Sequence, residues 1–299
     1  MGFSTQLQNA ILYTLAYADV FDYPLTAHEI YRYLTGMNVS FEEVSQVLEE
    51  QRHGLFIQDG DYFMLAGRAE IIAIRRRRAK NSSRLWPKAV RYGRWIASLP
   101  FVRMVAITGS LAMNNLEQGK DIDYLIVTAA RRLWTCRALS LLIVHFAKLG
   151  GLQLCPNYLV TEDVLELKDH SLYAAHELTQ MISLSGSEIY HTMRHLNMWT
   201  NEYLPNAQGA PNLSFDTPRF NFPLSLQRVF EFILNILQVQ WFEHWEMNRK
   251  IKKLSREQSL SAEAFFSADV CKGHVDRHGF YTEQALRERL ETFSLELIK

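Results

Sequence analysis

The first seventy residues alternate amphipathic stretches with turn signals. Apolar residues recur at helical spacing over residues 5–20, and Pro24 ends that stretch. Capping boxes begin at Thr26 and at Ser40, each with a glutamate three residues later, and each predicts the start of a helix. Over residues 55–65, two short apolar runs flank an Asp-Gly-Asp turn, which predicts a β-hairpin. The pattern therefore predicts three helices followed by a hairpin.

This order of elements resembles a winged helix-turn-helix domain that covers about residues 5–66. Charge argues against DNA reading by this domain, because residues 1–67 hold nine acidic and two basic side chains. The expected recognition helix, which begins after Ser40 and is closed by Gly54, carries four glutamates that would oppose phosphates. The alternative is a docking or dimerisation module, and an oligomer formed through this domain is one expectation.

Residues 68–94 have the opposite charge, with ten basic side chains and one acidic side chain. Arg84, Lys88 and Arg91 follow helical spacing and share one face. Pro87 lies inside the pattern, which predicts that a helix restarts there. Two interpretations stay open for this segment. One is a solvated linker, and the other is a contact with a polyanion such as RNA, DNA or nucleotide phosphates.

The candidate chemistry lies between two apolar runs that predict buried strands, residues 101–108 and 122–127. Gly109-Ser110 directly follows the first run, at a strand-to-helix turn where backbone N–H groups can approach phosphate. Asp121 and Asp123 begin the second run, and alternation along a strand places both side chains on one face. Two adjacent carboxylates repel each other unless a cation lies between them, and Mg²⁺ prefers such oxygens.

The apolar strand, Gly109-Ser110, a ten-residue spacer and Asp121-Ile122-Asp123 resemble the motif of the polymerase-beta-like nucleotidyltransferase superfamily. The resemblance covers about residues 100–165 and implies attack by a hydroxyl on the α-phosphorus of a nucleoside triphosphate. It implies that Gly109 and Ser110 hold the β,γ-phosphates and that the two aspartates ligate Mg²⁺ (or Mn²⁺). Lys120 would contact phosphate or act as a surface lysine. Three arginines past the second strand are further candidates for the triphosphate: Arg131, Arg132 and Arg137.

The chain departs from the family pattern at the third acid. Active members usually place it on a later strand, and the polar residue within the candidate strand here, residues 152–160, is Asn157. An amide can coordinate a metal through its oxygen but does not accept the attacking proton. Glu162 and Asp163 follow closely and would substitute if the strand ended early. Without a third acid, a slow enzyme or a catalytically weak nucleotide-binding sensor is expected.

The remainder of the chain has a mainly helical pattern. Helices are expected over residues 171–184, 188–196 and 224–254, the last with apolar positions at core spacing. The Pro- and Asn-rich residues 201–223 are typical of a lid or a partner-binding loop. Cys271, His274 and His278 share a helical face if that segment is a helix, but a structural zinc site needs a fourth ligand. The alternative is an anion-binding patch that faces the active site and consists of Lys272, His274, Arg277 and His278.

Composition sets the remaining expectations. Acidic and basic residues balance at 32 each, which excludes a globally basic nucleic-acid coat protein. Three scattered cysteines without a CxxC motif favour the reducing cytoplasm. The most apolar run, residues 138–147, is half a membrane span, so no membrane partner is expected.

The predicted fold class is α+β, with a nucleotidyltransferase core of mixed sheet and helices. The predicted parts are a winged-helix-like domain (1–67), a basic helical linker (68–98), the core (99–170) and a helical C-terminal region (171–299). The predicted function is Mg²⁺-dependent transfer from a nucleoside triphosphate to an unknown acceptor, which could be a small molecule, a protein or a nucleic acid. A nucleotide sensor and a nucleic-acid-binding regulator are the alternatives.

Overall fold

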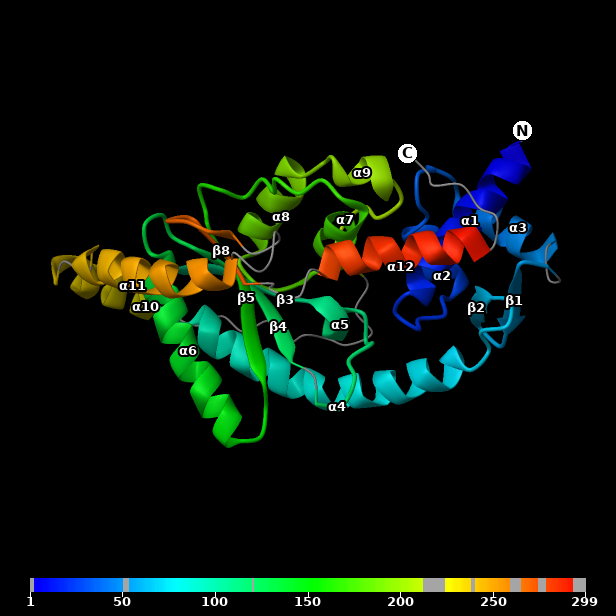
Figure 1. Ribbon diagram of the computed structural model, residues 1–299. Coiled ribbons are helices and arrows are strands. Elements are labelled where there is room, and N and C mark those ends of the chain that lie inside the picture. The colour runs from blue at the N-terminus through cyan, green and yellow to red at the C-terminus, as the bar shows by residue number, and fades with distance from the viewer. Residues whose placement is uncertain are drawn as a thin grey trace.

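The computed structural model describes residues 3–50, 54–119, 121–211, 224–237, 240–258, 265–273 and 278–292. The fold is mixed α+β, as expected, and its centre is a six-stranded mixed sheet (Figure 1). The strand order is β6-β3-β4-β5-β8-β7, with β4 and β5 parallel and the other neighbours antiparallel. The strands span β3 Val102–Thr108, β4 Ile122–Thr128, β5 Leu154–Thr161, β6 Ile182–Ser185, β7 Phe265–Phe266 and β8 Val270–Lys272.

The N-terminal module consists of three helices and a hairpin. Its elements are α1 Phe3–Asp19, α2 Ala27–Arg32, α3 Phe41–Glu50, β1 Phe56–Asp59 and β2 Tyr62–Leu65. The first capping box is complete, because the Thr26 hydroxyl accepts from the Glu29 N–H and the Glu29 carboxylate accepts from the Thr26 N–H. Ser40 makes the same reciprocal pair with Glu43. The local sequence therefore fixes where α2 and α3 begin.

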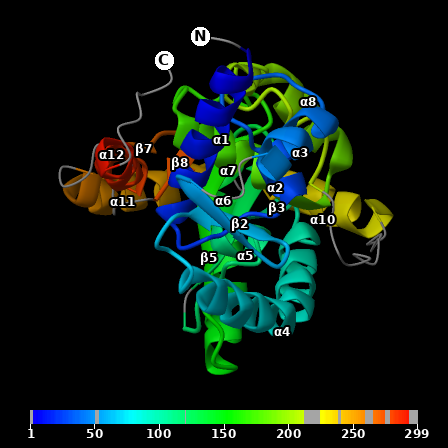
Figure 2. The same cartoon turned by 90° about the vertical axis from the view of Figure 1, so that its right-hand side faces the viewer.

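A single long helix, α4 Ile71–Ala97, leads from this module to the sheet (Figures 1 and 2). The predicted restart at Pro87 is wrong, because α4 continues through it. The Pro87 ring is exposed, while Trp86, Ala89 and Tyr92 pack into the core beneath the sheet. Burial of that face offsets the one hydrogen bond that proline removes from the helix.

Helices cover both faces of the sheet. Side chains of α4 and of α6 Leu133–Leu149 pack with one face, which includes Val105 and Ile107 of β3. Side chains of α7 Leu172–Gln180 and α8 Ser187–Leu196 pack with the other face, which includes Met104 and Ala106. Because β3 and β4 are buried on both sides, their sequences are almost continuously apolar rather than alternating, with Arg103 and Asp123 as the charged exceptions.

The C-terminal half differs from the sequence expectation in three places. The predicted helix over residues 171–184 stops at Gln180, and β6 then pairs with β3 at the sheet edge. The predicted helix over residues 224–254 is divided into α10 Leu224–Ile236 and α11 Gln240–Gln258. The hairpin of β7 and β8 was not predicted; it adds to β5. A short helix, α9 Thr200–Tyr203, begins the expected loop, of which residues 212–223 lie outside the described residues.

The apolar face expected to pack in the core at α10 is instead exposed. Helix α10 contacts the sheet domain through polar groups, because the Gln227 amide donates to the Leu99 carbonyl and Glu231 pairs with Arg103. Leu234 is its apolar contact with the core. The exposed apolar side chains on α10, α11 and the residue that follows α10 are Val229, Phe230, Phe232, Ile233, Ile236, Leu237, Trp241 and Trp245. In the described part of the chain, no helix is both long and apolar enough to cross a bilayer.

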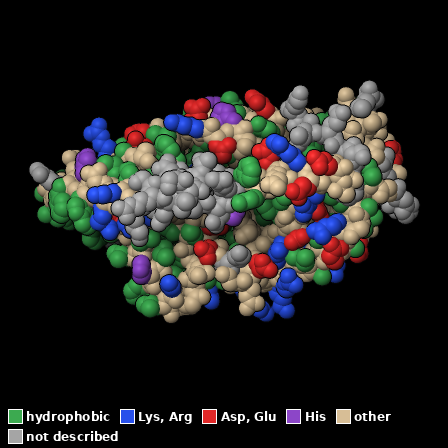
Figure 3. Space-filling model, in the orientation of Figure 1, with side chains coloured by type: hydrophobic (Ala, Val, Ile, Leu, Met, Phe, Trp, Pro, Cys, Tyr) green, Lys and Arg blue, Asp and Glu red, His purple; other side chains and the backbone are tan. Residues whose placement is uncertain are grey.

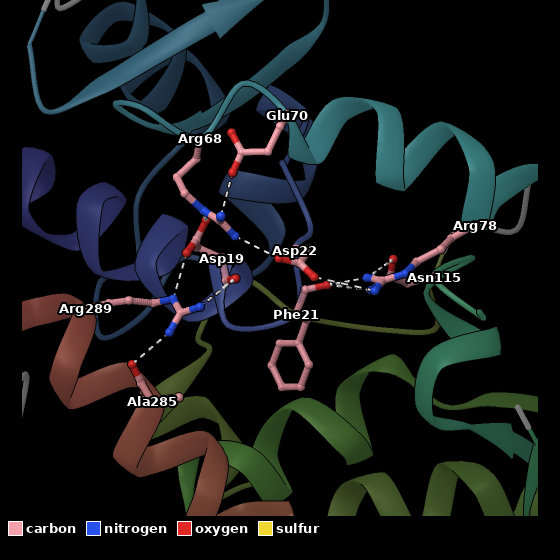
Figure 4. Close-up of polar contacts among 9 residues, drawn as sticks. All are labelled: Asp19, Phe21, Asp22, Arg68, Glu70, Arg78, Asn115, Ala285 and Arg289. Carbon is pink, nitrogen blue, oxygen red and sulfur yellow. Dashed lines mark hydrogen bonds and ion pairs between the residues drawn. The ribbon is translucent and has the colours of Figure 1, made fainter. Parts of the chain in front are cut away.

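The last described helix, α12 His278–Thr292, packs against the N-terminal module. Leu286 and Leu290 enter the core of that module. At its edge, Asp19 at the end of α1 accepts from Arg68 and from Arg289 of α12, each at 2.7 Å (Figure 4). The two ends of the chain therefore share a core and a buried carboxylate.

Candidate functional site

A cavity of about 860 Å³ lies where the N-terminal module meets the edge of the sheet. Five of the predicted site residues line its wall: Gly109, Ser110, Asp121, Asp123 and Asn157. They come from the end of β3, the start of β4 and the first half of β5, which lie side by side in the sheet. Lys120, the remaining predicted residue, lies outside the described residues.

Gly109 is required at its position for two independent reasons. Its φ is +63°, in the left-handed region that side chains disfavour. A Cβ atom on Gly109 would also lie 2.8 Å from Oδ2 of Asp123. The glycine-serine turn therefore brings the backbone directly against the carboxylate, and any larger residue would displace one of them.

The two aspartates enter the cavity from the start of β4. In the sheet register, Asp123 pairs with Thr108 on one side and with Cys155 on the other. The Asn157 amide donates a short hydrogen bond to Oδ1 of Asp123. The Cys155 thiol in turn donates to the Asn157 amide oxygen. Asn157 therefore faces the acidic pair and donates to one of its oxygens.

A third carboxylate reaches the cavity from a helix rather than a strand. Glu177 on α7 lines the wall, and its pKa is raised to about 7 by burial, while the charge of Lys272 acts in the opposite direction. The pKa of Asp123 is also raised to about 7, by burial first, then by Glu177 and Asp121. These carboxylates repel one another across the cavity, so the site is built for a positive charge or for a proton.

The donor set fits a divalent ion that completes its shell from substrate. Among the described residues, no three His, Cys, Asp or Glu side chains converge into a complete metal site. Mg²⁺ is usually held by one or two carboxylates, with phosphate oxygens and waters supplying the other positions. Asp121 and Asp123 match that requirement, and the Asn157 amide stands beside them to orient Asp123.

Several predicted alternatives lie elsewhere. Glu162 follows the far end of β5, five residues beyond Asn157, which corresponds to about 17 Å along a strand. Its carboxylate lies 3.7 Å from Arg103, away from the cavity, and Asp163 follows it in the chain. Neither substitutes for the third acid. The predicted triphosphate ligands Arg131, Arg132 and Arg137 also follow the far end of β4 and do not line the cavity.

The helical face considered for Cys271, His274 and His278 is not formed by Cys271 and His278. Cys271 lies in strand β8 and is buried, so it does not share a helical face with His278 at the start of α12. His274 lies outside the described residues. His278 lines the cavity, on the side of α12.

The N-terminal module forms an aromatic wall of the same cavity. Tyr17, Phe21 and Tyr33 line it, and the Tyr17 ring stacks on the ring of His176 at 4.0 Å between centroids. Burial lowers the pKa of His176 to about 3, so this imidazole is neutral. Gln180 contacts its Nδ1, while Nε2 is buried without a hydrogen-bond partner in the described structure.

Ion pairs fix this wall against α4. Arg78 donates to the Phe21 carbonyl at 2.8 Å and lies 3.5 Å from the carboxylate of Asp22 (Figure 4). It also reaches Asn115 on the loop after α5 Gly109–Ala112. Among the basic residues of 68–94, Arg78 lines the cavity, whereas Arg84, Lys88 and Arg91 do not. The basic face of α4 and the acidic pair therefore do not open onto one cleft.

Sequence reasoning missed Glu177, His176 and the aromatic wall. The strand motif located Gly109 and Asp123 because their spacing is local. Glu177 lies fifty-four residues beyond Asp123, on a helix, and no spacing rule connects them. Comparison with family models, with curated proteins and with solved structures finds no match for this chain.

Proposed function

We propose that this protein is a Mg²⁺-dependent nucleotidyltransferase that moves a nucleoside monophosphate from a nucleoside triphosphate to a hydroxyl group. The observation that carries the proposal is the packing of the Gly109-Ser110 turn against Asp123, with Asp121 in the same cavity. In this interpretation, strands β3 to β5 form a nucleotidyltransferase core. Asp121 and Asp123 would hold the ion, which would neutralise the triphosphate and the charge that develops during transfer. Gly109 and Ser110 would contact the β,γ-phosphates.

Glu177 supports an active enzyme over a sensor. A general base works best when its pKa lies near the operating pH, and the pKa of Glu177 is raised to about 7. In the proposed reaction, the acceptor oxygen attacks the α-phosphorus, its proton passes to Glu177, and pyrophosphate leaves. Asn157 then positions Asp123 instead of taking the proton. The lack of an acid at position 157 therefore does not require a slow enzyme.

The cavity favours a small molecule or a protein side chain as the acceptor. The N-terminal module, which we interpret as a winged-helix type, closes one side of the site with Tyr17, Phe21 and Tyr33. Its helix α3 exposes four glutamates to solvent, which opposes contact with DNA. The basic face of α4 lies outside the cavity. A polyanionic acceptor that binds the basic face of α4 would therefore contact a different surface from the one that holds the reacting groups.

Calorimetry of triphosphate binding tests the site. Wild type should bind a nucleoside triphosphate far more tightly with Mg²⁺ than without it, and the Asp121→Ala/Asp123→Ala variant should lose this difference. Glu188→Gln, on the exposed surface of α8, is the matched control and should bind like wild type. Equal affinity in wild type and in the double alanine variant would refute the metal assignment.

Transfer assays then separate an enzyme from a sensor. Labelled triphosphate, Mg²⁺ and fractionated small molecules or proteins should yield a labelled product, and Glu177→Gln should reduce its rate by about 10²–10⁴-fold while triphosphate binding persists. Asn157→Asp should bring little gain. If Asn157→Asp raises the rate and Glu177→Gln leaves it unchanged, Glu177 is not the base. Binding of Mg²⁺-triphosphate without transfer to any acceptor would favour the sensor, which the Asn157–Asp123 hydrogen bond allows.

A further inference from the structure

Helix α4 carries a row of cations along one exposed flank. Arg77, Lys80, Arg84, Lys88 and Arg91 follow one another at intervals of three or four residues, and all five are exposed. This α4 basic stripe extends over fifteen residues, and its ends lie about 21 Å apart at the α-helical rise. Helix α4 contains no acidic residue over its whole length. In Figure 3, Lys and Arg side chains project from the lower edge of the molecule, where Figure 1 places α4.

The stripe differs from the other cations of the same segment. Arg68, Arg75 and Arg78 form ion pairs with Asp19, Asp22, Glu29 and Glu70, which attach α4 to the acidic N-terminal module. Within the described part of the chain, none of the five stripe residues forms an ion pair. Three of the ten basic residues of the segment therefore hold the fold together, and the five of the stripe present positive charge to solvent.

An aromatic side chain stands at the end of the stripe. Trp95 lies one turn beyond Arg91 and is 45% exposed, which is high for such a large apolar residue. Tyr92 supports its ring edge-to-face at 5.0 Å, and the Arg91 guanidinium lies 5.9 Å from its centroid. A supported, exposed indole beside a row of cations offers a stacking surface next to an electrostatic track.

We infer that the α4 basic stripe binds the sugar-phosphate backbone of a single-stranded nucleic acid and that Trp95 stacks on one of its bases. About 21 Å accommodates roughly six phosphates at the ~3.4 Å spacing of a stacked strand, which five cations can follow. Stacking on Trp95 requires an unpaired base, because the bases of a duplex are covered on both faces. The site lies outside the cavity, so the nucleic acid is a bound partner and not the acceptor. This inference does not depend on nucleotidyl transfer.

Fluorescence anisotropy with labelled 12-nucleotide single strands of RNA and DNA tests the inference on the full chain, without triphosphate or Mg²⁺. Five phosphate contacts predict that log affinity falls with log salt at a slope of about −3.5, or roughly 130-fold between 50 and 200 mM salt. Arg84→Ala/Lys88→Ala/Arg91→Ala should reduce the slope to about −1.4. Trp95→Ala should weaken binding by about 5- to 150-fold and leave the slope unchanged.

The control removes three exposed cations elsewhere on the surface: Lys148→Ala/Arg228→Ala/Lys252→Ala. It should keep the wild-type slope, and thermal melting should show that all variants remain folded. No binding at 50 mM salt, or the same slope in wild type and the stripe variant, would overturn the inference. So would a duplex that binds as tightly as a single strand with no effect of Trp95→Ala. Tighter association with vesicles containing phosphatidylserine than with either oligonucleotide would assign the stripe to an anionic membrane instead.

Discussion

Replacing Glu177 by glutamine removes a charge that the folded protein accommodates poorly. Burial raises the pKa of this carboxyl from 4.5 to about 7, which corresponds to a cost of about 3 kcal/mol for the ionised form in the folded state. Above pH 7 the carboxyl is ionised in both the folded and the unfolded protein, so the folded state bears the full cost. Below about pH 4.5 it is protonated in both states, and the cost disappears.

The sign of the pH dependence follows from proton counts. Between pH 4.5 and 7 the folded state binds more protons at Glu177 than the unfolded state, so the contribution of Glu177 to the free energy of unfolding falls as the pH rises. Glutamine does not ionise, so Glu177→Gln should not show this decrease in stability. We therefore expect the variant to be about 2–3 kcal/mol more stable than wild type at pH 8, with the difference shrinking toward zero near pH 4.5.

Urea unfolding at several pH values between 4.5 and 8.5 measures this difference. Glu188→Gln is the control for a change of surface charge and should stay within about 0.5 kcal/mol of wild type throughout. A Glu177→Gln variant that is less stable than wild type at pH 8 would refute the reasoning, as would a difference that does not vary with pH. Together with the loss of transfer expected above, a more stable and inactive variant is typical of a buried catalytic group.

Three further predictions follow from the described contacts. Gly109→Ala should lose Mg²⁺-triphosphate binding and about 1–3 kcal/mol of stability. The control Gly60→Ala has a similar positive φ but open space around it, so it should lose about 1 kcal/mol and keep binding. Calorimetry measures the binding and urea unfolding measures the stability. Arg75→Ala should cost about 2–3 kcal/mol in urea unfolding, because it leaves the largely buried Glu29 carboxylate without its cationic partner, and Arg75→Lys should cost less. As the pH falls from 6.5 to 3, the wild type should lose up to about 1.4 kcal/mol of stability per pH unit, because His176 takes up a proton in the unfolded state and stays neutral in the folded state. His176→Phe should not show this loss in urea unfolding. Parallel slopes of stability against pH for the two proteins would contradict this assignment.

The sequence determined the parts of this protein that depend on neighbours along the chain. Capping boxes place the starts of α2 and α3, and a turn between apolar runs places the β1–β2 hairpin, because these signals act within a few residues. The Gly109 turn and the Asp121–Asp123 pair belong to the same class. Strand alternation places both carboxylates on one face, and the structure brings them into one cavity.

Only the tertiary structure decided the remainder. Glu177 and His176 enter the site because α7 packs against β3 of the sheet. This packing is a long-range contact, so the local sequence around α7 does not predict it. The sequence pattern predicts that residues 182–184 end a helix. In the structure they belong to β6, which pairs with the edge of β3, and its backbone hydrogen bonds outweigh the local helical pattern. The basic run of residues 68–94 separates into Arg75 and Arg78, which pair with the N-terminal module, and the exposed α4 basic stripe. A count of charges along the sequence does not predict that division, because the fold decides which side of α4 lies against the carboxylates of the N-terminal module.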